Sequence, residues 1–119
     1  MGLGLQGGGV RVARWFAKQG ARVTVTDLKT EKELESSVKD LTNRANLSHS
    51  KINFVLGKHR EEDFKNADLI IRNPDVPRNS PFLEIAGKNG VPVEMDESLF
   101  LQLCPNPENV IGVTGTRGK

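Results

Sequence analysis

The fold is decided by the stretch Gly2-Leu3-Gly4-Leu5-Gln6-Gly7, which precedes a run of helical, one-sided apolar residues. Three glycines at this spacing, with Asp27 twenty residues after Gly7 at the end of the next expected strand, match the dinucleotide-binding pattern. Such glycines permit a tight turn, close approach of a ligand to the backbone, and a helix N-terminus that favours negative charge. The stretch therefore predicts a nucleotide site, and a tight turn without a ligand is the alternative.

The rest of the chain alternates between short apolar runs and amphipathic stretches, a pattern typical of a parallel sheet covered by helices. We expect strands at residues 23–26, 52–56, 69–71, 91–94 and 110–114, and helices at residues 10–19, 30–45 and 61–65 and from residues 81 and 96 onward. Thr30 and Glu33 fit a capping box, and Asp96 is placed to cap the last helix. The predicted fold class is α/β, with a Rossmann-like, doubly wound parallel sheet.

The first strand of such a sheet is expected to be truncated in this sequence. A doubly wound sheet normally has a strand directly before its glycine turn, and only Met1 precedes Gly2. Since that strand lies in the middle of the sheet, its two neighbours would lack a partner. We expect residues 110–114 or a second copy of the chain to fill the position, so that the fragment self-associates there.

Composition indicates one domain and excludes several classes of protein. The chain has 119 residues, and Pro105 and Pro107 divide it into a domain at residues 1–107 and the start of another at residues 108–119. Its 17 Lys and Arg and 15 Asp and Glu residues are scattered, which argues against nucleic acid as a partner. One cysteine and no long apolar run predict a cytoplasmic protein without a membrane span.

The sequence ends on a second glycine-rich segment, Thr114-Gly115-Thr116-Arg117-Gly118-Lys119, after an apolar run. In a phosphate-binding loop the glycines let backbone N–H groups surround phosphate oxygens, the lysine reaches the outer phosphates, and a following Ser or Thr holds Mg²⁺. Val113 stands where the general pattern has its first glycine. The segment therefore predicts a variant phosphate loop, and a glycine-rich connector is the alternative.

These features together resemble the Mur ligases of peptidoglycan synthesis. Two further segments agree: residues 67–74, which end in Asn-Pro, and residues 96–100, which read Asp-Glu-Ser-Leu-Phe. The resemblance covers essentially the whole chain and points to the branch that adds D-glutamate to UDP-N-acetylmuramoyl-L-alanine. Arg117 and the Leu5-Gln6 pair argue against the branch that adds L-alanine, which usually has His in the phosphate loop and Gly-Gly near the opening.

The resemblance implies that this domain binds the UDP part of the substrate and not NAD. The residues to which it assigns UDP binding are Gly4, Leu5, Gln6, Asp27, Leu28, Lys29, Asn73, Pro74 and Asp75. Asp75 replaces the family's usual glycine, and Gln6 replaces a more usual Thr. From the residues alone, Asp27 could instead be a cap and Lys29 a solvated side chain.

The resemblance also implies the chemistry of the parent protein. In this family ATP phosphorylates the substrate carboxylate, and the incoming amino acid attacks the acyl phosphate to form an amide, with Mg²⁺ as cofactor. ATP would bind at Thr114, Gly115, Thr116, Arg117, Gly118 and Lys119. The catalytic residues, the metal ligands and the D-glutamate site would lie beyond this chain, so the fragment is expected to bind and not to catalyse.

Several other residues and two other functions stay open. His49 and His59 lack the spacing of metal ligands, and we expect them to be solvated loop side chains. Arg72 and Arg78 bracket the Asn-Pro turn and could contact a diphosphate or lie on the surface. The alternative functions are an NAD-binding oxidoreductase domain and a non-enzymatic, nucleotide-sensing regulatory module.

Overall fold

A computed structural model describes residues 1–43 and 52–113 of the chain. Helices and strands alternate in it, which confirms the α/β class. The elements are α1 (Gly8–Lys18), β1 (Val23–Asp27), α2 (Glu35–Asn43), β2 (Ile52–Leu56), α3 (Glu61–Lys65), β3 (Ile70–Ile71), α4 (Pro81–Lys88), β4 (Val93–Glu94), α5 (Asp96–Leu103) and the 3-10 helix η2 (Pro107–Asn109). Within the described residues, no helix combines the length and the apolar character needed to cross a membrane.

The strands form two parallel pairs. β1 pairs with β2, with Val23 opposite Ile52, and β3 pairs with β4, with Ile70 opposite Val93. The first residues of the chain lie between the two pairs. The N–H of Gly2 donates to the carbonyl of Thr26 at 2.8 Å, and the N–H of residue 73 donates to the carbonyl of residue 1 at 2.9 Å. Backbone hydrogen bonds therefore connect residues 1–2 to both pairs.

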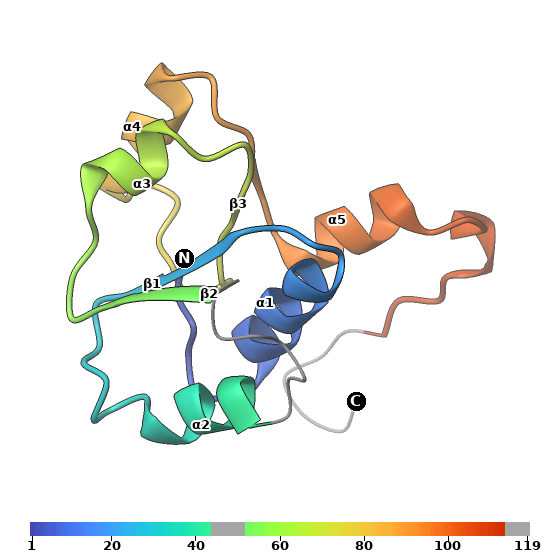
Figure 1. Cartoon of the computed structure of the whole chain (residues 1–119). Coiled ribbons are helices and arrows are strands. Elements are labelled where there is room, and N and C mark those ends of the chain that lie inside the picture. The colour runs from blue at the N-terminus through green and yellow to red at the C-terminus, as the bar shows by residue number, and fades with distance from the viewer. Residues whose placement is uncertain (44–51, 114–119) are drawn as a thin grey trace.

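The helices cover the strands from two sides. Figure 1 shows α3 and α4 together on one side of the strands, and α1 and α2 on the opposite side. Each side has its own apolar cluster, since the helices present their buried stripes to the strands. The α1–α2 side contains Leu3, Val10, Ala13, Val25, Leu34 and Leu41, and the α3–α4 side contains Phe64, Ile70, Ala86 and Val91.

Local signals explain where several helices begin. The predicted capping box is confirmed before α2, where Glu33 Oε2 accepts hydrogen bonds from the N–H and the hydroxyl of Thr30 at 2.8 and 2.7 Å. Ser80 is the N-cap residue of α4, with Pro81 at its first position. The prediction for the last helix was wrong by one residue. Met95 is the N-cap residue of α5, and Asp96 is its first helical residue.

The prediction for residues 110–114 was wrong in the part that the structure describes. Residues 110–113 form no strand, and Ile111 is 88% exposed. They follow α5 and η2, which extend away from the strands in Figure 1. An apolar β-branched run has strand propensity, but a strand also needs a neighbour with which to pair. Residues 110–113 thus do not lie between β1 and β3.

Candidate functional site

A cavity of about 350 Å³ lies where β1 and β3 end, the edge at which ligands bind in parallel sheets. Three segments that are distant in sequence line it: the glycine turn, residues 27–29 at the end of β1, and residues from 73–82 after β3. His59, which follows β2, completes the lining. Its volume falls in the range of small-ligand pockets.

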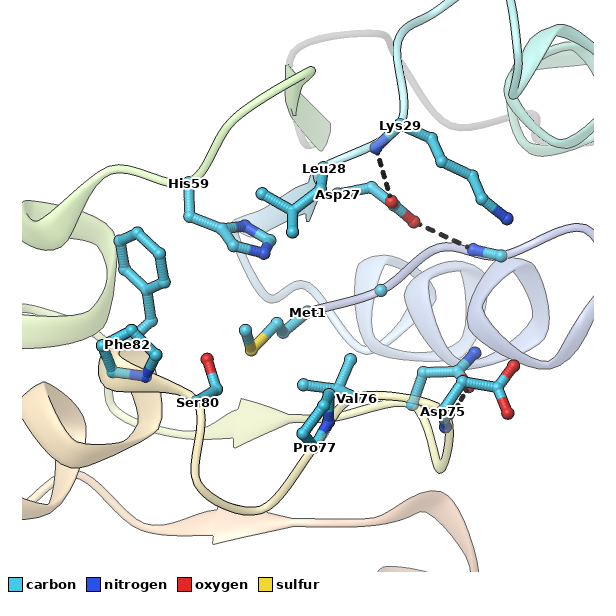
Figure 2. Close-up of a pocket in the computed structure, with 14 residues that line it drawn as sticks. Met1, Asp27, Leu28, Lys29, His59, Asp75, Val76, Pro77, Ser80 and Phe82 are labelled. Atoms are coloured by element: carbon cyan, nitrogen blue, oxygen red, sulfur yellow. Dashed lines mark hydrogen bonds between the residues drawn. The ribbon is translucent and has the colours of Figure 1, made fainter.

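Asp27 holds the glycine turn in place. Its Oδ2 accepts a hydrogen bond from the N–H of Gly4 at 3.2 Å, and its Oδ1 accepts one from the N–H of Lys29 at 2.9 Å (Figure 2). The side chain is buried, with 8% of its surface exposed. A buried carboxylate needs such partners because its desolvation is costly. Asp27 therefore ties the turn before α1 to the loop after β1.

The Asn73 turn forms the facing side of the cavity. Asn73 Oδ1 accepts a hydrogen bond from the N–H of Asp75 at 3.1 Å, and its carbonyl accepts one from the N–H of Val76 at 2.9 Å. A Cβ on Gly2 would come within 2.9 Å of the Asn73 Cβ, so only glycine fits there. Asp75, in contrast, has no positive φ. The family's usual glycine is thus not required by the backbone at Asp75.

His59 is the functional candidate that the sequence analysis missed. Its ring lies in the cavity wall and packs edge-on against Phe82 and Phe64, with centroids 4.9 and 5.6 Å away. Its Nδ1 lies 2.6 Å from the hydroxyl oxygen of Thr26. Burial, and then the Met1 ammonium, lower the pKa of His59, while Asp27 partly offsets this effect. The expectation of a solvated loop side chain was therefore wrong, whereas His49 lies outside the described residues.

The structure brings six of the nine predicted UDP-binding residues together around the cavity. These are Gly4, Asp27, Leu28, Lys29, Asn73 and Asp75. The other three, Leu5, Gln6 and Pro74, follow lining residues in the sequence but do not line the cavity themselves. The predicted ATP-binding residues 114–119 lie outside the described residues, so their arrangement stays a prediction.

Residues 1–94 match the family described as Mur ligase MurD-like, N-terminal domain. The chain belongs to the MurD-like Mur ligases. Proteins named UDP-N-acetylmuramoylalanine--D-glutamate ligase are similar to it along its whole length. Identity is 49% over 119 residues with the one from Roseiflexus sp. (strain RS-1) and 45% over 119 residues with the one from Borreliella burgdorferi (strain ZS7). With the one from Treponema pallidum (strain Nichols) it is 43% over 120 residues.

This MurD-like chain spans about a quarter of the length of these relatives. It covers 24% of the Roseiflexus and Borreliella proteins and 21% of the Treponema protein, and in each case all of this chain is aligned. No solved structure matches the chain.

In this MurD-like domain Arg72 neither faces the candidate nucleotide cavity nor lies on the surface, the two roles considered from sequence. It is buried, with 8% of its surface exposed, and it does not line the cavity. Its Nη1 donates to the carbonyl of Val76 at 2.9 Å, and its Nη2 lies 2.9 Å from Met95 Sδ. Arg72 thus connects the turn after β3 to the start of α5. Arg78 lies beside it on a separate surface depression.

Proposed function

We propose that this MurD-like domain binds the UDP part of UDP-N-acetylmuramoyl-L-alanine in the cavity at the ends of β1 and β3. The observation that carries the proposal is the convergence of six family-predicted residues on one cavity in a chain of this family. The relatives are named as ligases that join D-glutamate to UDP-N-acetylmuramoylalanine. The domain would thus hold the nucleotide end of the substrate and leave the sugar and peptide end to other parts of the protein.

The chemistry of the cavity lining supports the proposal. Its apolar side chains include Met1, Leu28 and Phe82, which suit the faces of a nucleobase. Backbone of the glycine turn, the cationic side chain of Lys29 and the carboxylate of Asp75 also line it. α1 begins directly after this turn and has no acidic residue of its own in its first turn, so its N-terminus favours an anion. We expect the diphosphate at the glycine turn.

Membership of the MurD-like family argues against an NAD-binding oxidoreductase domain and against a nucleotide-sensing regulatory module.

We further propose that the two strand pairs are the two halves of one doubly wound parallel sheet. Two hydrogen bonds support this arrangement, because a central strand bonds to both neighbours: the N–H of Gly2 donates to Thr26 on one side, and the N–H of residue 73 donates to the carbonyl of Met1 on the other. Self-association of the fragment through the edges of β1 and β3 stays a prediction, and sedimentation of the chain at several concentrations tests it.

For the parent protein we propose an ATP-dependent ligase that forms an amide between D-glutamate and the UDP-linked substrate. Residues 1–107 would be the UDP-binding domain, and residues 108–119 the start of the ATP-binding domain. ATP and Mg²⁺ would act through residues 114–119 and through residues that this chain does not include, so the chain alone is expected to bind without catalysis.

Calorimetric titration of the 119-residue chain with UDP and, separately, with NADH tests the proposal. We expect a saturable heat of binding with UDP and none with NADH. Binding of NADH with no response to UDP would overturn the proposal in favour of an oxidoreductase domain.

A further inference from the structure

Arg72 lies where the chain leaves β3 and turns toward the cavity. Its backbone N–H donates to the carbonyl of Glu94 at 2.9 Å, and the N–H of Asn73 donates to the carbonyl of Met1 at 2.9 Å. The backbone of Arg72 therefore still belongs to the paired strands, whereas the turn begins after it. The Arg72 side chain is 8% exposed and does not line the cavity. The guanidinium thus lies inside the fold and outside the cavity.

The Asn73 turn, which follows Arg72, is one wall of the cavity. Four of its residues line the cavity, and Figure 2 shows three of them on that wall, namely Asp75, Val76 and Pro77. At the end of the turn, the carbonyl of Val76 accepts a hydrogen bond from Arg72 Nη1 at 2.9 Å. Within the described residues, no other donor reaches this oxygen. Arg72 therefore fixes the end of the turn.

The other contact of the guanidinium is with α5. Nη2 lies 2.9 Å from Sδ of Met95, the N-cap residue of α5. A hydrogen bond with Asp96 raises the pKa of Glu97 in the first turn of α5, and the charge of Arg72 acts in the opposite direction. In the part of the chain that the structure describes, no carboxylate forms an ion pair with Arg72. Since a thioether is a weak acceptor, the carbonyl of Val76 is the stronger partner.

We propose that Arg72 is a positioning residue for nucleotide binding, which holds the Asn73 turn in its binding form and connects that form to the position of α5. This inference rests on the proposed function, because the turn is a wall of the cavity assigned to UDP. A partly buried carbonyl that loses a charged donor must move or bind water. If the turn then adopted its binding form about a tenth of the time, the affinity for UDP would fall about tenfold.

The start of α5 lies close to both walls of the cavity. It contacts the Asn73 turn through Arg72, and a Cβ on Gly8, the first residue of α1, would lie 4.0 Å from Asp96 Oδ2. α5 also precedes residues 108–119, the proposed start of the ATP-binding domain. Met95 does not line the cavity. A change at Met95 when UDP binds would therefore report the connection through Arg72.

Two substitutions of Arg72 and one matched control test this role. Arg72→Met keeps the apolar stem and removes every donor, whereas Arg72→Lys keeps the charge and one group that can donate to the carbonyl of Val76. Arg78→Met is the control, because it makes the same chemical change at an exposed arginine. Arg78 lines the same surface depression as Arg72 and does not line the cavity.

The first measurement is calorimetric titration of each variant of the 119-residue chain with UDP, well below its melting temperature. We expect Arg72→Met to bind UDP about tenfold more weakly than Arg78→Met. Arg72→Lys should recover part of this loss, and Arg78→Met should bind UDP as the unsubstituted chain does.

The second measurement follows backbone amides in the ¹⁵N-labelled variants. At saturating UDP the Met95 amide should shift in the unsubstituted chain and in Arg78→Met, and this shift should disappear in Arg72→Met. A side chain that only supports the fold would not control this shift. Without ligand, the Asp75 and Val76 amide hydrogens should exchange with solvent about tenfold faster in Arg72→Met than in Arg78→Met.

Three results would overturn the role of Arg72. The first is equal UDP affinity in Arg72→Met and Arg78→Met, even if Arg72→Met melts at a lower temperature. The second is a Met95 shift that persists in Arg72→Met, and the third is unchanged amide exchange in the ligand-free turn. If Arg72→Met does not fold, Arg72→Lys takes its place, and UDP affinity equal to that of Arg78→Met would again overturn the role.

Failure of the unsubstituted chain to bind UDP would instead contradict the proposed function. The amide exchange of the ligand-free turn does not depend on UDP, so the two failures are distinguishable.

Discussion

Replacing Gly9 by alanine is expected to destabilise the domain, although the same change in a helix interior is ordinarily favourable by about 1 kcal/mol. A Cβ on Gly9 would come within 3.0 Å of the carbonyl oxygen of Gly2 and closer still to that of Leu3. These atoms belong to backbone that the hydrogen bond from Gly2 to Thr26 holds in place. Either α1 or residues 2–3 must therefore move.

The size of the effect follows from two opposed terms. Overpacking against a rigid neighbour costs up to about 3 kcal/mol, and the gain in helix propensity offsets about 1 kcal/mol of it. We expect a net loss of about 2 kcal/mol in the free energy of unfolding, or a melting temperature lower by roughly 8 °C for a chain of this size. UDP affinity should fall as well, since the glycine turn lines the cavity.

The assay is urea unfolding of Gly9→Ala beside two matched controls. Gly8 is the preceding residue of α1, and its Cβ would meet only Asp96 Oδ2, at 4.0 Å. Gly87 in α4 has no atom within 4 Å of its Cβ position. Both alanine controls should be neutral or stabilising. The reasoning is refuted if Gly9→Ala unfolds at the same urea concentration as Gly8→Ala.

Four further predictions concern stability and titration. Asp27→Asn should cost about 1–3 kcal/mol in urea unfolding, because one of the two N–H groups bound to the carboxylate loses its acceptor; unchanged stability would contradict this. Phe64→Ala should cost about 3–5 kcal/mol, since the ring is 2% exposed, and a loss below 1 kcal/mol would be inconsistent with its burial. Thr30→Ala should raise the pKa of Glu33, which hydrogen bonds from Thr30 hold low, and a ¹³C NMR titration measures it; an unmoved pKa would speak against the capping box. Burial lowers the pKa of the Met1 ammonium from 8.0 to about 6, so in a chain with a free Met1 amine stability should rise by about 2 kcal/mol from pH 6 to pH 8, and N-terminal acetylation should abolish the rise; equal pH profiles with and without acetylation would refute it.

The elements that sequence predicted best are those with strong local signals. The capping box at Thr30 and Glu33, the proline at the start of α4, and the apolar stripes of the helices act within one turn of chain, so residue types alone reveal them. Residues 110–113 were predicted wrongly because their strand propensity depends on a neighbouring strand. Pairing partners are a property of the whole fold.

The site was predictable only in part, for the same reason. Family resemblance identified Asp27, Lys29 and Asn73 as residues of one pocket, and the structure places them around one cavity. His59 could not be found from spacing, because its role depends on the bridge between Lys58 and Asp27 and on the packing of rings from α3 and α4. The one local signal was its position three residues after the end of β2.

Binding of UDP at this cavity is tested most directly by mapping the backbone amide chemical shifts of the ¹⁵N-labelled chain during titration with UDP. We expect saturable shifts concentrated at Gly4, Lys29, His59, Asn73 and Asp75, the residues that meet at the cavity. Shifts confined to α5, or none at saturating UDP, would contradict the claim that this cavity holds the nucleotide.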